Sequence, residues 1–297
     1  MLDDVLGGGL QSGDLALVAG PPGVGKTVAA LQWARDAALS GERVLFVCYE
    51  HDPDTLLLRL LALELGSRAG AEIQARQTIQ DLARGASDRR GLEAHLHQSP
   101  SGEAALAELR RYADNLVLVG ASGARTTVTE INDLIEHGAD GEAATAAFID
   151  YLQKVAMVPE PEFEAEKVTR TVEGLKDLAL RWEIPVVLLS AVDAAGMTAQ
   201  RLRLHHLRGS SAIAFEADVV LMLNDKEKAV SKVHLTYDTV RAHSFRNWTV
   251  MSVEKNRGGP NLVDLEFEKD FAHFRFDPDG GFVAEQLVSE RLDEAAL

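Results

Sequence analysis

Residues 20–27, Gly20-Pro21-Pro22-Gly23-Val24-Gly25-Lys26-Thr27, match the pattern G-x-x-x-x-G-K-[ST] of a phosphate-binding loop. Glycines let the backbone turn tightly, so that several N–H groups can point at one phosphate chain. Lys26 adds a positive charge for the β- and γ-phosphates, and the Thr27 hydroxyl can bind Mg²⁺. The pattern therefore predicts a nucleotide site formed by Gly20, Pro21, Pro22, Gly23, Val24, Gly25, Lys26, Thr27 and Val28.

A strand and a helix are expected on either side of this loop, as the pattern requires. Residues 15–19 are a short apolar run of strand length, and apolar residues recur at helical spacing over residues 27–39. The alternative is a Gly/Pro turn beside a chance lysine, and the flanking pattern argues against it.

Composition excludes several classes of protein. The 297 residues are 46% hydrophobic, enough for a sizeable core, with neither a signal peptide nor a membrane-spanning apolar run. The single cysteine, Cys48, lies in an apolar run, so we expect a buried thiol and a cytoplasmic protein without membrane contact. The formal net charge of −16 argues against general nucleic-acid binding, although a ring-shaped motor needs basic groups only where the strand passes.

Alternating apolar strands and amphipathic helices predict an α/β fold, with a mostly parallel, twisted sheet that carries helices on both faces. The expected parallel strands are residues 15–19, 44–48, 115–119, 145–149, 184–189 and 217–223, and the clearest helices are 27–39, 54–65, 127–137 and 168–182. From residue 232 the pattern changes to β structure, with antiparallel strands expected at 232–237, 247–253 and 262–268.

The domain prediction is a single ATPase-sized domain over residues 1–276, with a helical surface segment at 67–115 and an acidic tail at 277–297. The short polar start leaves no room for a separate N-terminal domain.

Two carboxylates follow buried strands. Phosphoryl hydrolysis needs a carboxylate that holds Mg²⁺, a base for the attacking water and positive charge for the transition state. Asp150 ends the strand at 145–149 and is the candidate metal ligand; the alternative is a turn aspartate. Glu50 ends the strand at 44–48, where ligands of parallel sheets bind, and is the candidate base rather than a solvated loop residue. Ser190 ends a further strand and either contacts the same site or simply terminates the strand.

Lys255 and Arg257 flank Asn256 after a late strand. Alternate residues of an extended chain point the same way, so both cations can aim at one target. Aimed at a neighbouring subunit's nucleotide, they would stabilise the transition state. Taken alone, they fit solvated hairpin charges better.

Several stretches together resemble RecA-type ATPases of the DnaB, RadA and KaiC group. Ile149-Asp150-Tyr151-Leu152-Gln153, for example, matches the I-D-Y-L-Q segment of DnaB replicative helicases. The matching blocks, in family order, are Leu2–Leu10 with Gly13-Asp14 and the phosphate loop, Tyr49–His51 with Leu57–Ala62, Ile149–Gln153, Leu207–Ile213 with Ala217–Val220, and Glu254–Pro260.

The resemblance implies a RecA-like core that works as a homo-oligomer, a hexamer in the helicases, with ATP and Mg²⁺ bound between subunits. It implies that Lys255 and Arg257 reach the neighbour's γ-phosphate, which reverses their interpretation as solvated charges. The catalytic residues it implies are Glu50, Lys26, Lys255 and Arg257, and the metal ligands are Thr27 and Asp150.

The resemblance also places a DNA-contacting loop at Arg201, Arg203, Arg208 and Gly209. Contacts to the phosphate backbone there would be independent of base sequence and sensitive to salt.

Four features depart from the family's pattern. Ser190-Ala191 stands where the family has Ser-Gln, so the polar group that couples nucleotide to DNA is missing. The family's N-terminal domain and linker helix are absent, and the loop Pro21–Gly25 is closer to that of KaiC and RadA. The fourth departure is an acidic loop, which would repel a DNA strand and carries Glu160, Glu162, Glu164 and Glu166.

Two functions of different classes follow. The first is an ATP-driven helicase or translocase motor that acts on single-stranded DNA. The second is a regulatory or assembly ATPase, whose nucleotide state controls oligomerisation or the binding of a protein partner without DNA unwinding; the negative charge, the acidic loop and Ala191 favour it. A recombinase-like filament is a third, weaker alternative.

Overall fold

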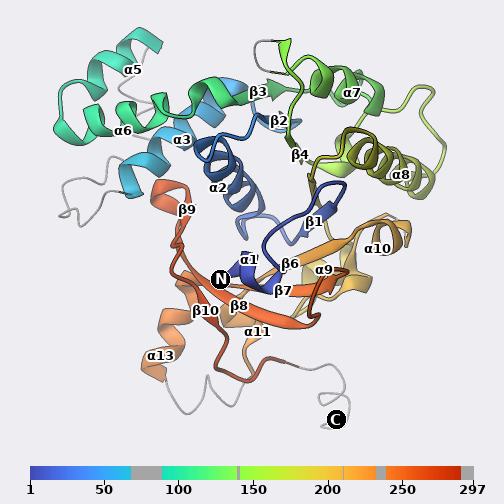
Figure 1. Cartoon of the computed structure of the whole chain (residues 1–297). Coiled ribbons are helices and arrows are strands. Elements are labelled where there is room, and N and C mark those ends of the chain that lie inside the picture. Colours follow the sequence, from blue (N-terminus) through green and yellow to red (C-terminus); the bar gives the residue numbers. More distant parts are fainter. Residues whose placement is uncertain (68–88, 139–140, 210, 232–238, 289–297) are drawn as a thin grey trace.

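The computed structural model describes residues 1–67, 89–138, 141–209, 211–231 and 239–288. A ten-stranded sheet runs through it in the order β10-β8-β7-β6-β1-β5-β4-β2-β3, and β9 pairs with β8 (Figure 1). The parallel strands are β1 (Leu15–Ala19), β2 (Val44–Cys48), β3 (Leu116–Gly120), β4 (Ala146–Asp150), β5 (Val186–Ser190) and β6 (Val219–Asp225). The antiparallel strands are β7 (Trp248–Asn256), β8 (Val263–Asp270), β9 (Arg275–Phe276) and β10 (Gly281–Phe282).

This architecture confirms the predicted α/β fold, with a mostly parallel sheet and antiparallel strands added near the C-terminus. The ends of the strands differ from the predicted ends by a few residues. The predicted strand at 232–237 lies outside the described residues, and β9 and β10 are too short for a period-two pattern to reveal them.

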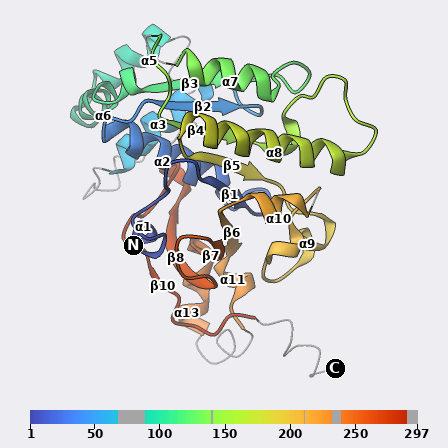
Figure 2. The same cartoon turned by 45° about the vertical axis from the view of Figure 1, so that its right-hand side comes forward.

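Helices cover both faces of the parallel strands (Figures 1 and 2). In β1, Ala16 and Val18 belong to the core under α2 (Lys26–Leu39) and α3 (Pro53–Ser67). Leu15, Leu17 and Ala19 belong to the opposite core, under α7 (Val128–Glu136) and α8 (Glu164–Trp182). Because both faces are buried, every position of the strand is apolar.

The remaining helices are short or peripheral. They are α1 (Leu2–Val5), α5 (Arg89–Leu96), α6 (Pro100–Arg110), α9 (Ala194–Thr198), α10 (Ala212–Glu216), α11 (Lys226–Ala229) and α13 (Thr239–Ser244). In the described ranges, no helix is both long enough and apolar enough to cross a membrane.

Local signals set the helix ends that frame the site. Asp52 accepts a hydrogen bond from the Thr55 amide at 2.7 Å, and Pro53 occupies the first position of α3, where its missing N–H costs nothing. Thr127 and Glu130 form a reciprocal capping box at the start of α7.

The predicted surface segment and tail agree with the structure only in part. α5 and α6 lie within 67–115 and pack on α3 through a small apolar cluster, while residues 68–88 lie outside the described part. After residue 276 the chain stays on the sheet: β10 pairs with β8, and Leu287 pairs with Val230. The predicted tail therefore packs against the domain as far as residue 288, and residues 289–297 are not described.

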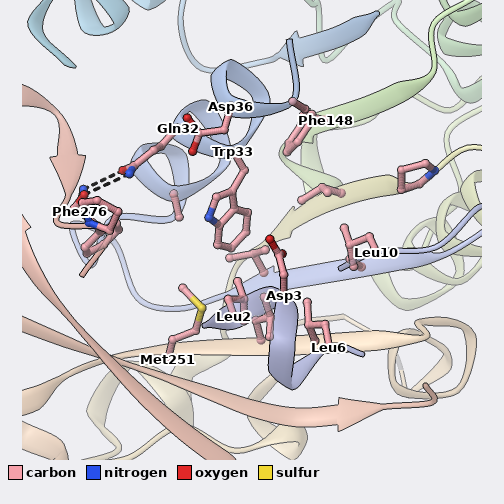
Figure 3. Close-up of a pocket in the computed structure, with 18 of the residues that line it drawn as sticks. Leu2, Asp3, Leu6, Leu10, Gln32, Trp33, Asp36, Phe148, Met251 and Phe276 are labelled. Carbon is pink, nitrogen blue, oxygen red and sulfur yellow. Dashed lines mark hydrogen bonds between the residues drawn. The ribbon is translucent and has the colours of Figure 1, made fainter. Parts of the chain in front are cut away.

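A cavity of about 490 Å³ separates α1 and α2 above the sheet (Figure 3). Its walls are mainly apolar, and they include Leu2, Trp33 and Met251. At one end Gln32 clamps Phe276, donating to its carbonyl at 3.1 Å and accepting from its amide at 2.9 Å. This clamp fixes β9 to α2 and holds Phe276 beside the phosphate loop.

A buried ion pair joins α2 to α3. The Arg35 guanidinium donates to both oxygens of Glu64 at 2.7 and 2.9 Å, and the Tyr112 hydroxyl donates to Glu64 at 3.1 Å. Burial alone would lower the pKa of Arg35, but the hydrogen bonds to Glu64 and Asp36 outweigh it and raise the pKa. Glu64 has no exposed surface. Its loss would leave the largely buried Arg35 with the half-exposed Asp36 at 2.9 Å and the more distant Glu108 at 3.7 Å.

We predict that Glu64→Ala lowers the free energy of unfolding by about 3–5 kcal/mol, the usual effect of breaking a buried pair. The matched control is Glu93→Ala, which breaks an exposed pair with Arg110 and should change it by less than about 1 kcal/mol. Urea unfolding followed by circular dichroism measures both. Equal effects would mean that the buried pair contributes no more than a surface one.

Candidate functional site

The phosphate loop connects β1 to α2 with a backbone that only glycine adopts easily. Gly23 has φ 81° and Gly25 has φ 104°, both in the left-handed region. A Cβ on Gly25 would lie 2.6 Å from Cζ of Phe276 and 2.7 Å from Cζ of Phe271. Val24 is buried and anchors the loop, while Lys26 turns back and donates to the carbonyls of Gly20 and Pro21 at 2.8 and 3.1 Å.

The structure brings the two predicted metal ligands together. The Thr27 hydroxyl donates to Asp150 Oδ2 at 2.7 Å, although 123 residues separate them in the chain. The strand order explains the contact, because only β5 lies between β1 and β4. Ser190 at the end of β5 is fully buried at the same edge of the sheet. Thr27 and Asp150 can thus hold one hard cation together with phosphate oxygens.

The electrostatics of the site favour such a cation. Burial and the charge of Glu50 raise the pKa of Asp150, against the hydrogen bond from Thr27 and the charge of Lys26. Burial lowers the pKa of Lys26, and Asp150 and Glu50 oppose that shift. In the described part of the chain, no group of three or more His, Cys, Asp or Glu residues could bind a metal alone. A metal at Asp150 would take its other ligands from the Thr27 hydroxyl, from water and from a bound phosphate.

Glu50 follows β2 and lines a second cavity, beside the phosphate loop. Cys48 pairs with Asp150 in the β2–β4 register, and the Tyr49 amide donates to the Asp150 carbonyl at 2.7 Å. Glu50 and Asp150 both line this cavity of about 900 Å³ together with Lys26 and Thr27. The position suits a base for an attacking water, and this role stays a prediction.

Sequence reasoning gave no role to Arg59, which also lines the cavity. It is half-buried on α3, and burial lowers its pKa despite the nearby Asp150 and Glu50. Its guanidinium lies 4.5 Å from the ring centroid of Phe274. The sequence does contain a sign of such a role: Arg59 is the one arginine in a mostly apolar helix. A charge buried in such a helix requires a functional or structural partner.

Lys255 and Arg257 lie at the opposite edge of the sheet from the phosphate loop. β7 runs antiparallel to β6, so that the end of β7, with Lys255, lies beside the first residues of β6. Lys255 Nζ donates to the carbonyls of Ala214, Phe215 and Ala217, at and after the end of α10, at 2.9, 3.1 and 2.6 Å. Arg257 donates to Asp218 Oδ1 at 2.9 Å and to the Phe215 carbonyl at 2.6 Å. Neither lines the cavity of its own phosphate loop.

The arginines predicted to contact DNA are ion-paired within the chain. Arg201 binds both oxygens of Asp264 at 2.8 Å, and Arg203 donates to Glu254 at 2.8 Å. Arg208 pairs with Glu164 at 2.9 Å and lines the nucleotide cavity. Their role toward DNA stays a prediction, and of the three only Arg208 borders the nucleotide cavity.

The acidic loop is partly compensated as well. Glu160 pairs with Lys167 at 3.1 Å. Glu164 and Glu166 lie in the first turn of α8 and not in a loop as predicted, and they pair with Arg208 and Arg170. The expected repulsion of a DNA strand is correspondingly weaker than the sequence suggests.

Gly209 has φ 118°, and a Cβ there would lie 2.7 Å from Cγ2 of Val168 on α8. The backbone after Arg208 is therefore seated tightly against α8.

We predict that Gly25→Ala destabilises the protein by about 1–3 kcal/mol more than Gly41→Ala, the usual penalty of overpacking. Gly41 is the matched control because its φ is 103° and nothing lies within 4 Å of a Cβ there. Both substitutions strain the backbone, but only the first meets the aromatic rings. Urea unfolding without nucleotide measures the difference, and equal losses would contradict the tight contact with Phe271 and Phe276.

Comparison with known proteins agrees with this site. The family model described as DnaB-like helicase C-terminal domain matches residues 1–276. Among curated relatives, the replicative DNA helicase DnaB of Rickettsia bellii is 25% identical over 285 residues, covering 90% of this chain and 54% of the relative. The same helicase of Leifsonia xyli is 27% identical over 275 residues, covering 91% of this chain and 53% of that protein. The chain thus spans about half the length of the curated relatives it matches.

Solved structures support the fold. A DnaB-like replicative helicase, studied for its interactions with primase, aligns with TM-score 0.70 at 18% identity, over 93% of this chain and 59% of that one. The RadB recombinase aligns with TM-score 0.51 at 19% identity, over 90% of this chain and 92% of that one. Together with the match over residues 1–276, this shows that the chain belongs to the DnaB-like helicase C-terminal domain family.

Proposed function

We propose that the chain hydrolyses ATP with Mg²⁺ and serves as the motor of an oligomeric helicase or translocase that acts on single-stranded DNA. One observation carries the proposal: the Thr27 hydroxyl and the Asp150 carboxylate meet at 2.7 Å beneath a glycine-rich phosphate loop. Membership of the DnaB-like family supports the same reading.

The residues fit the roles that hydrolysis requires. Thr27 and Asp150 would hold Mg²⁺, which when bound neutralises part of the phosphate charge. Lys26 would leave the carbonyls of Gly20 and Pro21 to contact phosphate oxygens. Glu50 would orient and deprotonate water, and Arg59 places a second cation in the same cavity.

The far position of Lys255 and Arg257 supports an oligomer. A positive charge is needed at the γ-phosphate, yet these residues lie at the other edge of the sheet from their own phosphate loop. A neighbouring subunit could present them to that loop, as in a ring. A closed ring of six subunits is our proposal for the assembly.

The regulatory alternative also has support in the structure. Arg201 and Arg203 are compensated by Asp264 and Glu254, and the whole chain carries a net charge of −16. Arg208 is paired with Glu164 as well, so the arginines of the predicted DNA-contacting loop offer a DNA strand little free positive charge. In this alternative, nucleotide state would control assembly or a protein partner.

The ATPase rate, measured with and without single-stranded DNA at two salt concentrations, separates the two functions. A motor should be stimulated severalfold at low salt, and the stimulation should fade as salt rises because phosphate contacts release counterions. Lys26→Ala should abolish nucleotide binding and give the background rate. Hydrolysis without stimulation, together with no DNA binding at low salt, would reject the motor in favour of the regulatory ATPase.

We predict that Arg257→Ala lowers the hydrolysis rate by about 10³-fold or more, the usual contribution of an arginine finger, with ATP affinity nearly unchanged. The matched control is Arg246→Ala, which removes an exposed arginine paired with Glu227 and should leave the rate unchanged. Mixing Arg257→Ala with Lys26→Ala subunits should restore part of the activity, because one subunit supplies the phosphate loop and the other the finger. Normal hydrolysis by oligomeric Arg257→Ala protein would contradict the assignment.

A further inference from the structure

The segment that carries Arg208 is tied directly to the end of β5. Residues 191–193 and 206–208 run antiparallel, with Val192 paired to Leu207 and the Asp193 amide donating to the His206 carbonyl at 2.9 Å. The Arg208 amide donates to the Ala191 carbonyl at 3.2 Å. The Arg208 carbonyl takes no part in these bonds, and its hydrogen-bond partner lies outside the ladder.

Gln153 supplies that partner. Its Nε2 donates to the Arg208 carbonyl at 3.0 Å and to the Ser190 hydroxyl at 3.0 Å. Its Oε1 accepts from the Ala191 amide at 3.2 Å. The orientation of the amide follows from these partners, because a flipped group would set its oxygen against the Arg208 carbonyl. Both N–H groups and the oxygen of one side chain therefore join the end of β5 to the Arg208 segment.

Gln153 is also connected to the nucleotide site. It lies in a short 3₁₀ helix, Leu152–Lys154, that follows Asp150 at the end of β4. Leu152 is buried at 1% exposure and anchors this turn in the core. A displacement of Asp150 would therefore be carried to Gln153. Ala191 itself has no side-chain group that could make the link.

We propose that Gln153 is a positioning residue that transmits nucleotide occupancy at Thr27 and Asp150 to the backbone of the Arg208 segment. The inference rests on the proposed nucleotide site but not on DNA binding. With phosphate and metal held at Asp150, the turn with Gln153 is fixed, and its hydrogen bonds to Ser190, Ala191 and the Arg208 carbonyl hold the Arg208 segment against the end of β5. Without nucleotide the turn is freer, and the clamp opens more often.

Hydrogen exchange of the full chain tests this directly. In the wild-type protein, Mg²⁺ with a non-hydrolysable ATP analogue should slow backbone exchange in residues 203–209 about fivefold, the value of roughly one hydrogen bond. Gln153→Ala removes all three bonds and should abolish the slowing. Gln153→Glu, assayed at pH 8, fills the same space and keeps the acceptor for the Ala191 amide but loses both donors, so it should also abolish the slowing.

The matched control is Gln98→Ala, the same chemical change at an exposed position on the surface. It should keep the wild-type response. Binding of a fluorescent ATP analogue is measured for every variant. Failure of the wild-type chain to bind the analogue would reject the proposed nucleotide site itself. Binding without slowed exchange in the wild type, or slowing that survives in either Gln153 variant, would overturn the inference alone.

Discussion

The hydrogen bond from Thr27 to Asp150 is the contact on which the site depends. It spans 2.7 Å between the first turn of α2 and the end of β4, across the end of β5. No local pattern creates it, because the crossovers between β1, β4 and β5 must first set the strand order. Once that order is fixed, Ser190, Gln153 and the Arg208 segment gather at the same edge of the sheet.

Without a ligand, the charged groups of Asp150 and Lys26 are buried or partly buried and only partly compensated. Asp150 is 2% exposed and shares its cavity with Glu50, so burial and repulsion both raise its pKa. Lys26 is partly buried, and its ammonium group donates to two carbonyls of the phosphate loop. Buried charges that are only partly compensated cost stability, and functional sites are where proteins accept that cost. Compensated pairs elsewhere, such as Arg35 with Glu64, hold the surrounding helices together.

The sequence predicts the fold and the phosphate loop because their signals are local: apolar strand runs, a glycine pattern and carboxylates at strand ends. The partners of Arg201 and Arg203 could not be predicted in this way. Asp264 and Glu254 come from β8 and β7, so these pairs depend on antiparallel register rather than on spacing along the chain. Gln153 stood in a matching block, yet its partners Ser190 and Arg208 become visible only with the strand order.

The contacts of Lys255 and Arg257 suggest that the two cations do not play equal parts. Lys255 is held by three carbonyls at and after the end of α10, and replacing all of them would be costly. Arg257 is 53% exposed and engages Asp218 only through Oδ1. Asp218 Oδ2 keeps the Leu15 amide and Lys176 as partners, so Arg257 can leave without stranding a buried charge. We therefore propose that Arg257 is the cation that would leave Asp218 and the Phe215 carbonyl to reach a neighbouring subunit, while Lys255 stays on the carbonyls of α10.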